Sequence, residues 1–254
     1  MEQKNRMRLD KFLAACGIGT RSEVKQILKS GAVTVNGTVV KRPETKVDTS
    51  FDEVSSQGKR LSYNPFAALM FYKPAGCVTA TQDSLHKTVM DYIMHERKNE
   101  LFPVGRLDLD TEGLLLLIND GDLAHRLLSP RHHAEKTYFV RVRGHLSDED
   151  VKAFEKGVDI GEKSLTLPAK LSILSSGDIS EAELTIYEGK FHQVKRMFAA
   201  RGCEVIYLKR ISMAGISLDP QLVPGEWREL NEEELEMLSE RSKANVRAEE
   251  SGNF

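Results

Sequence analysis

Residues 105–130 read GRLDLDTEGLLLLINDGDLAHRLLSP and join an acidic loop to an apolar strand and a short helix. Asp108, Asp110 and Glu112 lie in the loop, and an unbroken aliphatic run follows at residues 114–118. A run this short, with turn residues on both sides, is typical of a fully buried strand. The three carboxylates therefore stand directly before a segment that must be buried. Either they only form a turn, or one of them is a catalytic group.

The segments on either side alternate strands and helices without the regular repeat of a parallel α/β fold. Apolar alternation and short apolar runs predict strands at residues 68–74, 135–144, 169–175 and 181–189, and one long kinked strand at 204–218. Helical spacing of apolar residues predicts helices at residues 123–129, 148–157, 192–202 and 231–241. This mixture predicts an α+β domain with a mixed, largely antiparallel sheet.

Residues 8–48 have the pattern of a small unit with two helices and a hairpin. The second helix has Thr20 or Ser22 as its candidate N-cap. Two valine-rich segments flank Asn36-Gly37, a dipeptide that favours the tight turn between antiparallel strands.

The chain is expected to have three parts. Residues 49–66 are polar and rich in turn formers, which predicts a linker. We place the small unit with its linker at residues 1–60 and a larger domain at 61–240. Residues 241–254 are expected to be a disordered tail.

The composition is that of an ordinary globular protein, with 40% hydrophobic and 29% charged residues in a chain of 254. No apolar run approaches the ~20 residues that span a bilayer, and the N-terminal residues lack the apolar core of a secretory signal. The three cysteines are far apart and odd in number, which fits neither a disulfide framework nor a C-x-x-C metal site. We therefore expect a cytoplasmic protein.

Two regions of the chain are basic, although the net charge of the whole chain is −2. Residues 1–48 carry ten Lys and Arg against five Asp and Glu, and residues 190–210 carry six against one. An acidic region at 229–254, with eight Glu against three Lys and Arg, offsets them. Basic patches of this kind bind phosphates, although charge alone leaves open that they are only solvated helix faces.

The N-terminal unit resembles the S4 RNA-binding domain. Two short helices before an Asn-Gly hairpin, with the sequence TRSEVKQILKSGAVTVNG at 20–37, carry the resemblance. In that family the second helix and the turn after it contact RNA, mostly at phosphates, which position the protein without reading sequence. The resemblance implies RNA contacts by Arg8, Lys11, Arg21, Lys25 and Lys29. The alternative is a two-helix appendage that binds no RNA.

The acidic loop and three further segments resemble the motifs of RsuA-type pseudouridine synthases. GRLDLDTEGLLLL at 105–117 matches the active-site motif G-R-L-D-x-x-T-x-G-L, and YKPAGCVTAT at 72–81 resembles the K-P-x-G motif. SPRHHAEKTYFVRV at 129–142 and EGKFHQVKRMFAARGCEV at 188–205 resemble the later motifs. The resemblance runs from about residue 7 to about residue 235, and four motifs in order are far more specific than one.

The family's reaction breaks the C1′–N1 bond of a uridine and rejoins the same uracil through C5. No atom is lost and nothing is oxidised, so the resemblance implies no cofactor. It implies that Asp108 is the nucleophile, whereas Asp110 and Glu112 fall at variable positions. The alternative for Asp108 is an aspartate that only forms the turn. No Cys, Asp or Glu stands at ligand spacing from His132 and His133, so no metal site is expected.

The later motifs imply the other groups of the site. Lys195 and Arg196 are adjacent on a predicted helix and about 100° apart, so only one can point towards Asp108. We favour Lys195 and keep Arg196 as the alternative; a further alternative is that both contact the RNA backbone. The resemblance implies that Tyr138 stacks on the uracil after that base leaves its helix. The alternative is that Tyr138 only packs in the core. Further RNA-facing groups are expected at Arg106, Arg131 and Arg196.

The segments at 129–142 and 165–174 are most similar to family members that modify small-subunit rRNA. The resemblance implies that the substrate is one uridine of 16S rRNA, uridine 516 by family inference, in free RNA or in an assembling small-subunit particle. A monomer is expected. The alternatives are a large-subunit (23S) rRNA synthase of the same family and a non-catalytic S4-type ribosome assembly factor.

Overall fold

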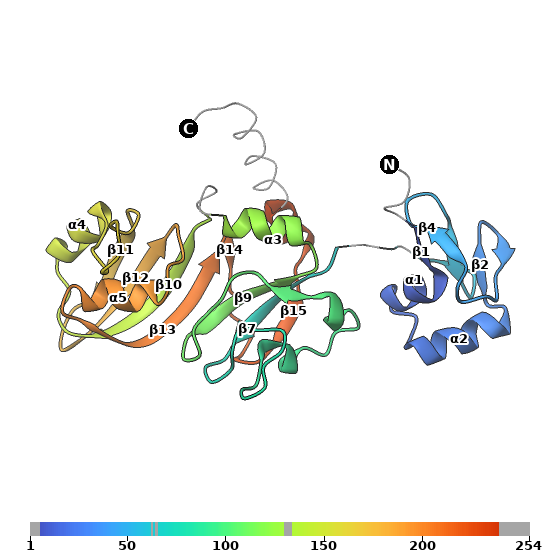
Figure 1. Cartoon of the computed structure of the whole chain (residues 1–254), viewed down its shortest axis with the longest axis horizontal. Coiled ribbons are helices and arrows are strands. Elements are labelled where there is room, and N and C mark those ends of the chain that lie inside the picture. The colour runs from blue at the N-terminus through green and yellow to red at the C-terminus, as the bar shows by residue number, and fades with distance from the viewer. Residues whose placement is uncertain (1–5, 62, 64–65, 130–133, 239–254) are drawn as a thin grey trace, which may run out of the picture. The chain divides into compact units, whose positions relative to one another are not determined.

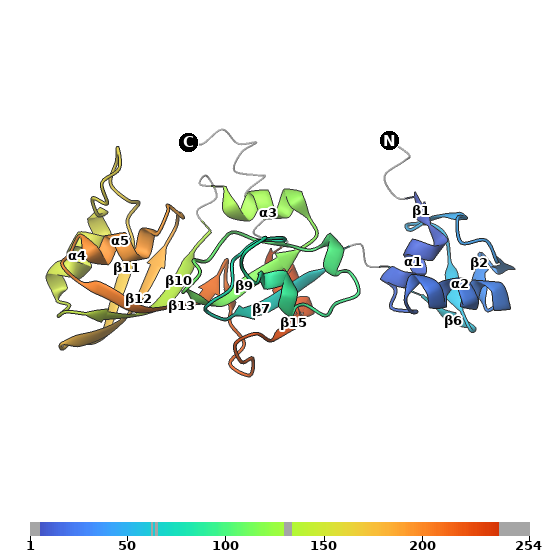
Figure 2. The same cartoon turned by 60° about the horizontal axis from the view of Figure 1, so that its bottom comes forward.

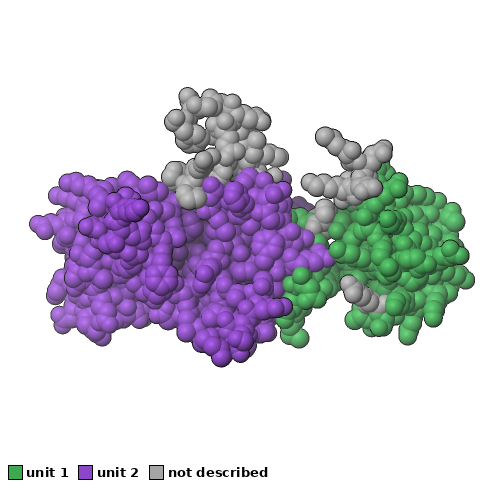
Figure 3. Space-filling model, in the orientation of Figure 1, with its two compact units in different colours: residues 1–66, 94–99 green, residues 67–93, 100–254 purple. Residues whose placement is uncertain are grey.

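A computed structural model describes residues 6–61, 63, 66–129 and 134–238, apart from the Arg21 side chain. The chain divides into two compact units (Figure 3). The N-terminal unit comprises residues 1–66 with 94–99, and the C-terminal unit comprises residues 67–93 with 100–254. The predicted tail at 241–254 lies outside the described residues.

The N-terminal unit contains the two helices and the hairpin that the sequence predicts (Figure 1). Helix α2 (Arg21–Ser30) begins with a capping box, in which Thr20 and Glu23 each bond the other's backbone, and ends at Gly31 with a left-handed φ of 80°. Asn36 and Gly37 form the hairpin turn with φ values of 51° and 78°. The other elements are β1 (Arg6–Arg8), α1 (Leu9–Ala15), β2 (Val33–Val35), β3 (Thr38–Val39) and β4 (Lys46–Asp48).

Part of the predicted linker is folded, so the prediction of a linker over all of 49–66 is wrong. Strand β5 (Val54–Ser56) pairs with β2, and β6 (Lys59–Arg60) pairs with β5, in a sheet of order β3-β2-β5-β6. Val54 is buried in the core of the unit. Such short strands are stable only through pairing with a distant hairpin, which local composition does not reveal.

The C-terminal unit is built on one mixed, largely antiparallel sheet, which confirms the predicted fold class. Among the described residues its strands follow the order β11-β12-β10-β13-β9-β7-β15, with β8 added to β9 and β14 added to β13. The strands are β7 (Ala68–Lys73), β8 (Phe102–Pro103), β9 (Glu112–Ile118), β10 (Lys136–Arg143), β11 (Lys170–Ser175), β12 (Ile179–Ile186), β13 (Glu204–Met213), β14 (Ile216–Ser217) and β15 (Trp227–Glu229). The helices are α3 (Gly121–Leu128), α4 (Asp148–Lys156) and α5 (Gln193–Ala199), with a short 3-10 turn at Val89–Tyr92; a further 3-10 turn, Lys98–Glu100, begins in the segment 94–99 that belongs to the N-terminal unit. Residues 232–238 are also helical.

The segment predicted as one kinked strand at 204–218 is a hairpin instead. Ala214 and Gly215 have φ values of 53° and 83°, and they reverse the chain between β13 and β14. The alternating apolar pattern continues through both strands, so the pattern alone does not reveal the turn between them.

Gly113 permits the parallel pairing between β9 and β13. A Cβ atom at this position would lie 2.2 Å from the carbonyl oxygen of Arg210, so no larger residue fits. This close approach fixes the acidic loop, which ends at β9, beside β13.

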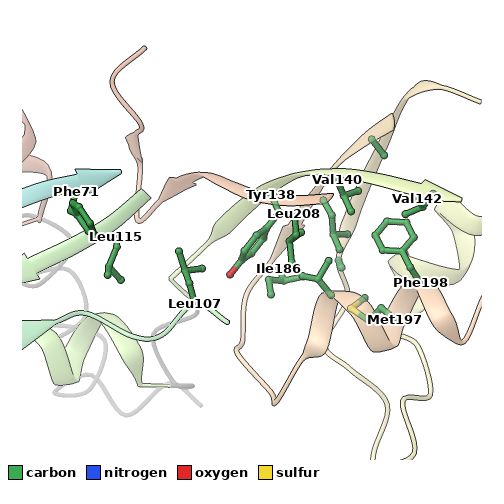
Figure 4. Packing of buried hydrophobic residues seen from close by; sticks show 14 of the residues in the cluster. Phe71, Leu107, Leu115, Tyr138, Val140, Val142, Ile186, Met197, Phe198 and Leu208 are labelled. Atoms are coloured by element: carbon green, nitrogen blue, oxygen red, sulfur yellow. The ribbon is translucent and has the colours of Figure 1, made fainter. Parts of the chain in front are cut away.

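The core of the C-terminal unit lies between the sheet and its helices. Figure 2 shows α4 and α5 on one face of the half of the sheet that contains β10, β12 and β13. Tyr138, Val140 and Val142 point into this core from alternate positions of β10, and Met197 and Phe198 meet them from α5 (Figure 4). Burial of alternate strand residues against one helix face fixes which side of α5 is turned inward.

Candidate active site

A fully buried lysine donates hydrogen bonds to the backbone of the acidic loop. Lys73, at the end of β7, is 0% exposed, and its ammonium donates to the carbonyl oxygens of Pro74, Asp108 and Thr111 at 3.1, 3.0 and 2.8 Å. Burial lowers the pKa of the Lys73 ammonium. These bonds use the charge of the lysine to fix the backbone on both sides of the Asp108 side chain.

A second anchor lies one residue before Asp108. The Thr79 hydroxyl donates to the Leu107 carbonyl at 2.8 Å and accepts from the Leu107 amide at 3.1 Å. The sequence YKPAGCVTAT thus supplies two groups, Lys73 and Thr79, that shape the loop. The loop in turn presents the Asp108 carboxylate, which is 30% exposed.

The structure brings Asp108 and Lys195 together. Lys195, on α5, places its ammonium 3.4 Å from Asp108 Oδ2 and 2.6 Å from Asp110 Oδ1. The hydrogen bond from Lys195 lowers the pKa of the Asp110 carboxyl. His192 is a second basic residue beside Asp108, because its Nε2 lies 3.7 Å from Asp108 Oδ1. Asp108 is therefore a partly exposed carboxylate with a lysine ammonium and an imidazole as neighbours.

Arg196 points away from Asp108 in the same helix. Its guanidinium donates to Glu162 at 2.8 Å, to the Phe191 carbonyl at 3.0 Å, and to the Ile160 carbonyl. Of the two adjacent basic residues, only Lys195 faces the acidic loop.

Tyr138 lies in the core beside the loop. Its side chain is 7% exposed, and it belongs to the same apolar cluster as Leu107. Figure 4 shows the ring with Leu107 on one side and with Leu208 and Ile186 on the other. The ring is therefore next to the residue that precedes Asp108, and it is more deeply buried than a stacking surface open to solvent would be.

Comparison with known proteins assigns this arrangement to a family. The family model described as RNA pseudouridylate synthase matches residues 67–200, which contain Asp108, Tyr138 and Lys195, and the S4 domain model matches residues 7–54. The chain belongs to the RNA pseudouridylate synthase family. It is an RNA pseudouridine synthase with an N-terminal S4 domain, as the resemblance of its motifs predicted.

Relatives of the synthase match over nearly their whole length. The uncharacterized RNA pseudouridine synthase YtzG of Bacillus subtilis (strain 168) is 50% identical over 92% of this chain and 99% of that protein. Ribosomal small subunit pseudouridine synthase A of Escherichia coli (strain K12) is 41% identical over 90% of this chain and 98% of that protein. A crystal structure of a pseudouridylate synthase, 38% identical, covers 91% of this chain and 99% of its own with a TM-score of 0.65.

The synthase places its other predicted RNA-facing residues in different surroundings. Arg106, Lys11, Lys25 and Lys29 are exposed. Arg8 is also exposed, but its guanidinium pairs with Asp10 at 2.7 Å. Arg131 and the Arg21 side chain lie outside the described residues.

Three functional groups of the synthase were missed by sequence reasoning. Lys73 stands in the K-P-x-G motif, and a lysine at the end of a buried strand could have signalled its role. Asp110 was treated as variable, yet it is the closer partner of Lys195. From the sequence, His192 was given no role, and no sequence signal places its ring beside Asp108.

The described residues contain neither a metal-binding cluster nor a membrane-spanning helix. Within them, no group of three or more His, Cys, Asp and Glu side chains could hold a metal ion. No helix in the same part of the chain is long and apolar enough to cross a membrane.

Proposed function

We propose that the synthase converts one uridine of 16S rRNA, uridine 516, to pseudouridine, with Asp108 as the nucleophile and without a cofactor. The observation that carries the proposal is the Asp108 carboxylate itself. It is 30% exposed, it stands on a loop fixed by Lys73 and Thr79, and the Lys195 ammonium lies 3.4 Å away. A preorganised anion with a nearby cation is what nucleophilic catalysis by a carboxylate needs.

The reaction conserves every atom of the nucleotide. The C1′–N1 bond breaks, the uracil turns, C1′ bonds to C5, and the proton on C5 is lost while N1 gains one. Three routes start from the Asp108 carboxylate: attack on C6, attack on C1′, and elimination through a glycal. In each of them Lys195 stabilises the carboxylate when it is released as an anion, and Tyr138 packs against the uracil and assists removal of the C5 proton.

The choice of 16S rRNA is supported by the names of relatives. Proteins of Vibrio cholerae and Escherichia coli at 43% and 41% identity, matched over 98% of their length, are named ribosomal small subunit pseudouridine synthase A. We also propose that the synthase is a cytoplasmic monomer that acts on the rRNA or on the assembling small subunit, with Arg8, Lys11, Arg21, Lys25, Lys29, Arg106 and Arg131 contacting RNA.

The test is to map pseudouridine in rRNA from cells with and without the gene. Loss of one pseudouridine from 16S rRNA alone, restored by the wild-type gene but not by Asp108→Asn, is the expected result. Loss from 23S rRNA would support the large-subunit alternative. Unchanged modification of both rRNAs would favour a non-catalytic assembly factor.

A further inference from the structure

Phe191 exposes a large apolar ring beside the candidate active site. The residue is 75% exposed, and it lies just before α5, which carries Lys195. Its chain neighbours Lys190 and His192 are polar, so the ring is not part of an apolar stretch. Single exposed apolar side chains are common, so the exposure of this ring counts only together with its fixed position near Asp108.

The backbone that carries Phe191 is fixed on both sides. Arg196 donates to the Phe191 carbonyl at 3.0 Å and is itself held by Glu162 at 2.8 Å. The Gln193 side chain, which is 4% exposed, accepts from the Lys190 amide at 2.9 Å. The ring therefore stands on a rigid turn, and binding a ligand there orders little additional backbone.

His192 connects this ring to Asp108. The two rings of Phe191 and His192 stack with their centroids 3.8 Å apart and their planes 20° from parallel. The same imidazole places its Nε2 3.7 Å from Asp108 Oδ1. His192 holds a left-handed φ of 48°, a conformation that is costly outside glycine and that collects at functional sites.

We propose that Phe191 is a preformed stacking surface for the base of a nucleotide next to the target uridine. The inference rests on the proposed function, in which Asp108 marks the place of that uridine. His192 contacts both groups, so the phenyl ring is one side chain removed from Asp108, and a base on the phenyl ring is a neighbour of the target rather than the target itself. Once a uridine leaves its helix, its neighbour loses a stacking partner, and an aromatic ring replaces that partner for any base.

The experiment measures tritium release from total RNA labelled at C5 of uridine and prepared from cells that lack the gene. Because total RNA contains the target whichever rRNA carries it, the assay remains valid if the 16S assignment fails. Enzyme-excess time courses at increasing enzyme concentration give the half-saturating concentration and the maximal rate separately. The variants are Phe191→Ala, Phe191→Leu, Phe191→Tyr and Phe191→Trp, with Leu174→Ala as a control for the loss of another exposed apolar side chain, 54% exposed, on β11.

Stacking predicts that Phe191→Ala and Phe191→Leu raise the half-saturating concentration about 5- to 150-fold, the range for one base on one aromatic ring. Phe191→Tyr and Phe191→Trp should remain near the wild type, and all variants should keep its melting temperature. Half-saturation within about twofold of the wild type for Phe191→Ala would overturn the inference. A half-saturating concentration for Phe191→Leu as low as that for Phe191→Tyr would also overturn it. So would a fall in the melting temperature that matches the loss of affinity.

Discussion

Replacing Lys73 with methionine should both destabilise the synthase and slow its reaction. Methionine keeps the length and the apolar stem of the side chain but removes the hydrogen bonds that the ammonium donates to the carbonyl oxygens of Pro74, Asp108, Leu109 and Thr111. The Thr111 carbonyl then loses the lysine as its donor, whereas the Asp108 carbonyl keeps the Thr111 amide at 3.1 Å and the Pro74 carbonyl keeps the Cys77 thiol at 3.5 Å. Because Lys73 is fully buried, water cannot easily take its place.

The magnitude follows from two opposing effects. Each buried carbonyl left without a donor costs about 1–3 kcal/mol. The variant no longer buries an ammonium, which recovers several kcal/mol of desolvation. The net loss in the free energy of unfolding should be about 1 kcal/mol, the usual size for a single substitution. A shift of the Asp108 side chain by about 1 Å would slow the chemical step about 100-fold.

Two measurements on the Lys73→Met variant test this reasoning. Urea unfolding gives the change in the free energy of unfolding, and single-turnover tritium release from saturating RNA gives the rate. Lys170→Met, on the exposed side of β11, is the matched control. A free energy of unfolding within about 0.5 kcal/mol of the wild type, the range of surface substitutions, together with an unchanged rate, would refute the role of Lys73.

Three further predictions concern the ring beside the loop, the S4 domain and a second buried lysine. Tyr138→Phe should keep RNA binding but lose the proton step, whereas Tyr138→Ala should lose both; equal near-wild-type tritium release would leave Tyr138 as a core residue. Lys25→Glu with Lys29→Glu should weaken RNA binding and flatten the slope of log K against log salt by about 0.7 per lost phosphate contact, and an unchanged slope would contradict these contacts. Burial lowers the pKa of Lys136 to about 8, so its cost to folding is present below pH 8 and disappears as the pH rises towards 10.5. Lys136→Met should therefore gain stability relative to the wild type at pH 7 and lose that gain, up to about 3 kcal/mol, by pH 10 in urea unfolding, while Lys170→Met shows no such trend.

Local patterns predicted the elements that local interactions determine. The cap at Thr20, the turn at Asn36-Gly37 and the buried strand at 114–118 all depend on neighbouring residues, and all were found. The strand at 54–56 was missed because it forms only by pairing with a distant hairpin.

In the candidate site, too, the sequence predicted what neighbouring residues determine but not what depends on distant packing. The motif around Asp108 is contiguous and was recognised from the sequence. The sequence favoured Lys195 but left Arg196 open as the alternative, because the choice depends on which face of α5 packs inward. Met197 and Phe198 turn that face into the core, and the resulting rotation directs Lys195 to Asp108.

The most direct test of the account is tritium release by purified Asp108→Asn. The amide is nearly isosteric with the carboxylate but is a far weaker nucleophile. The account predicts normal folding, RNA binding like that of the wild type in a filter assay, and no release above the enzyme-free background from rRNA labelled at C5. Asp122→Asn, an exposed aspartate in the first turn of α3, should behave as the wild type. Release by Asp108→Asn within about tenfold of the wild-type rate would contradict the assignment of Asp108 as the nucleophile.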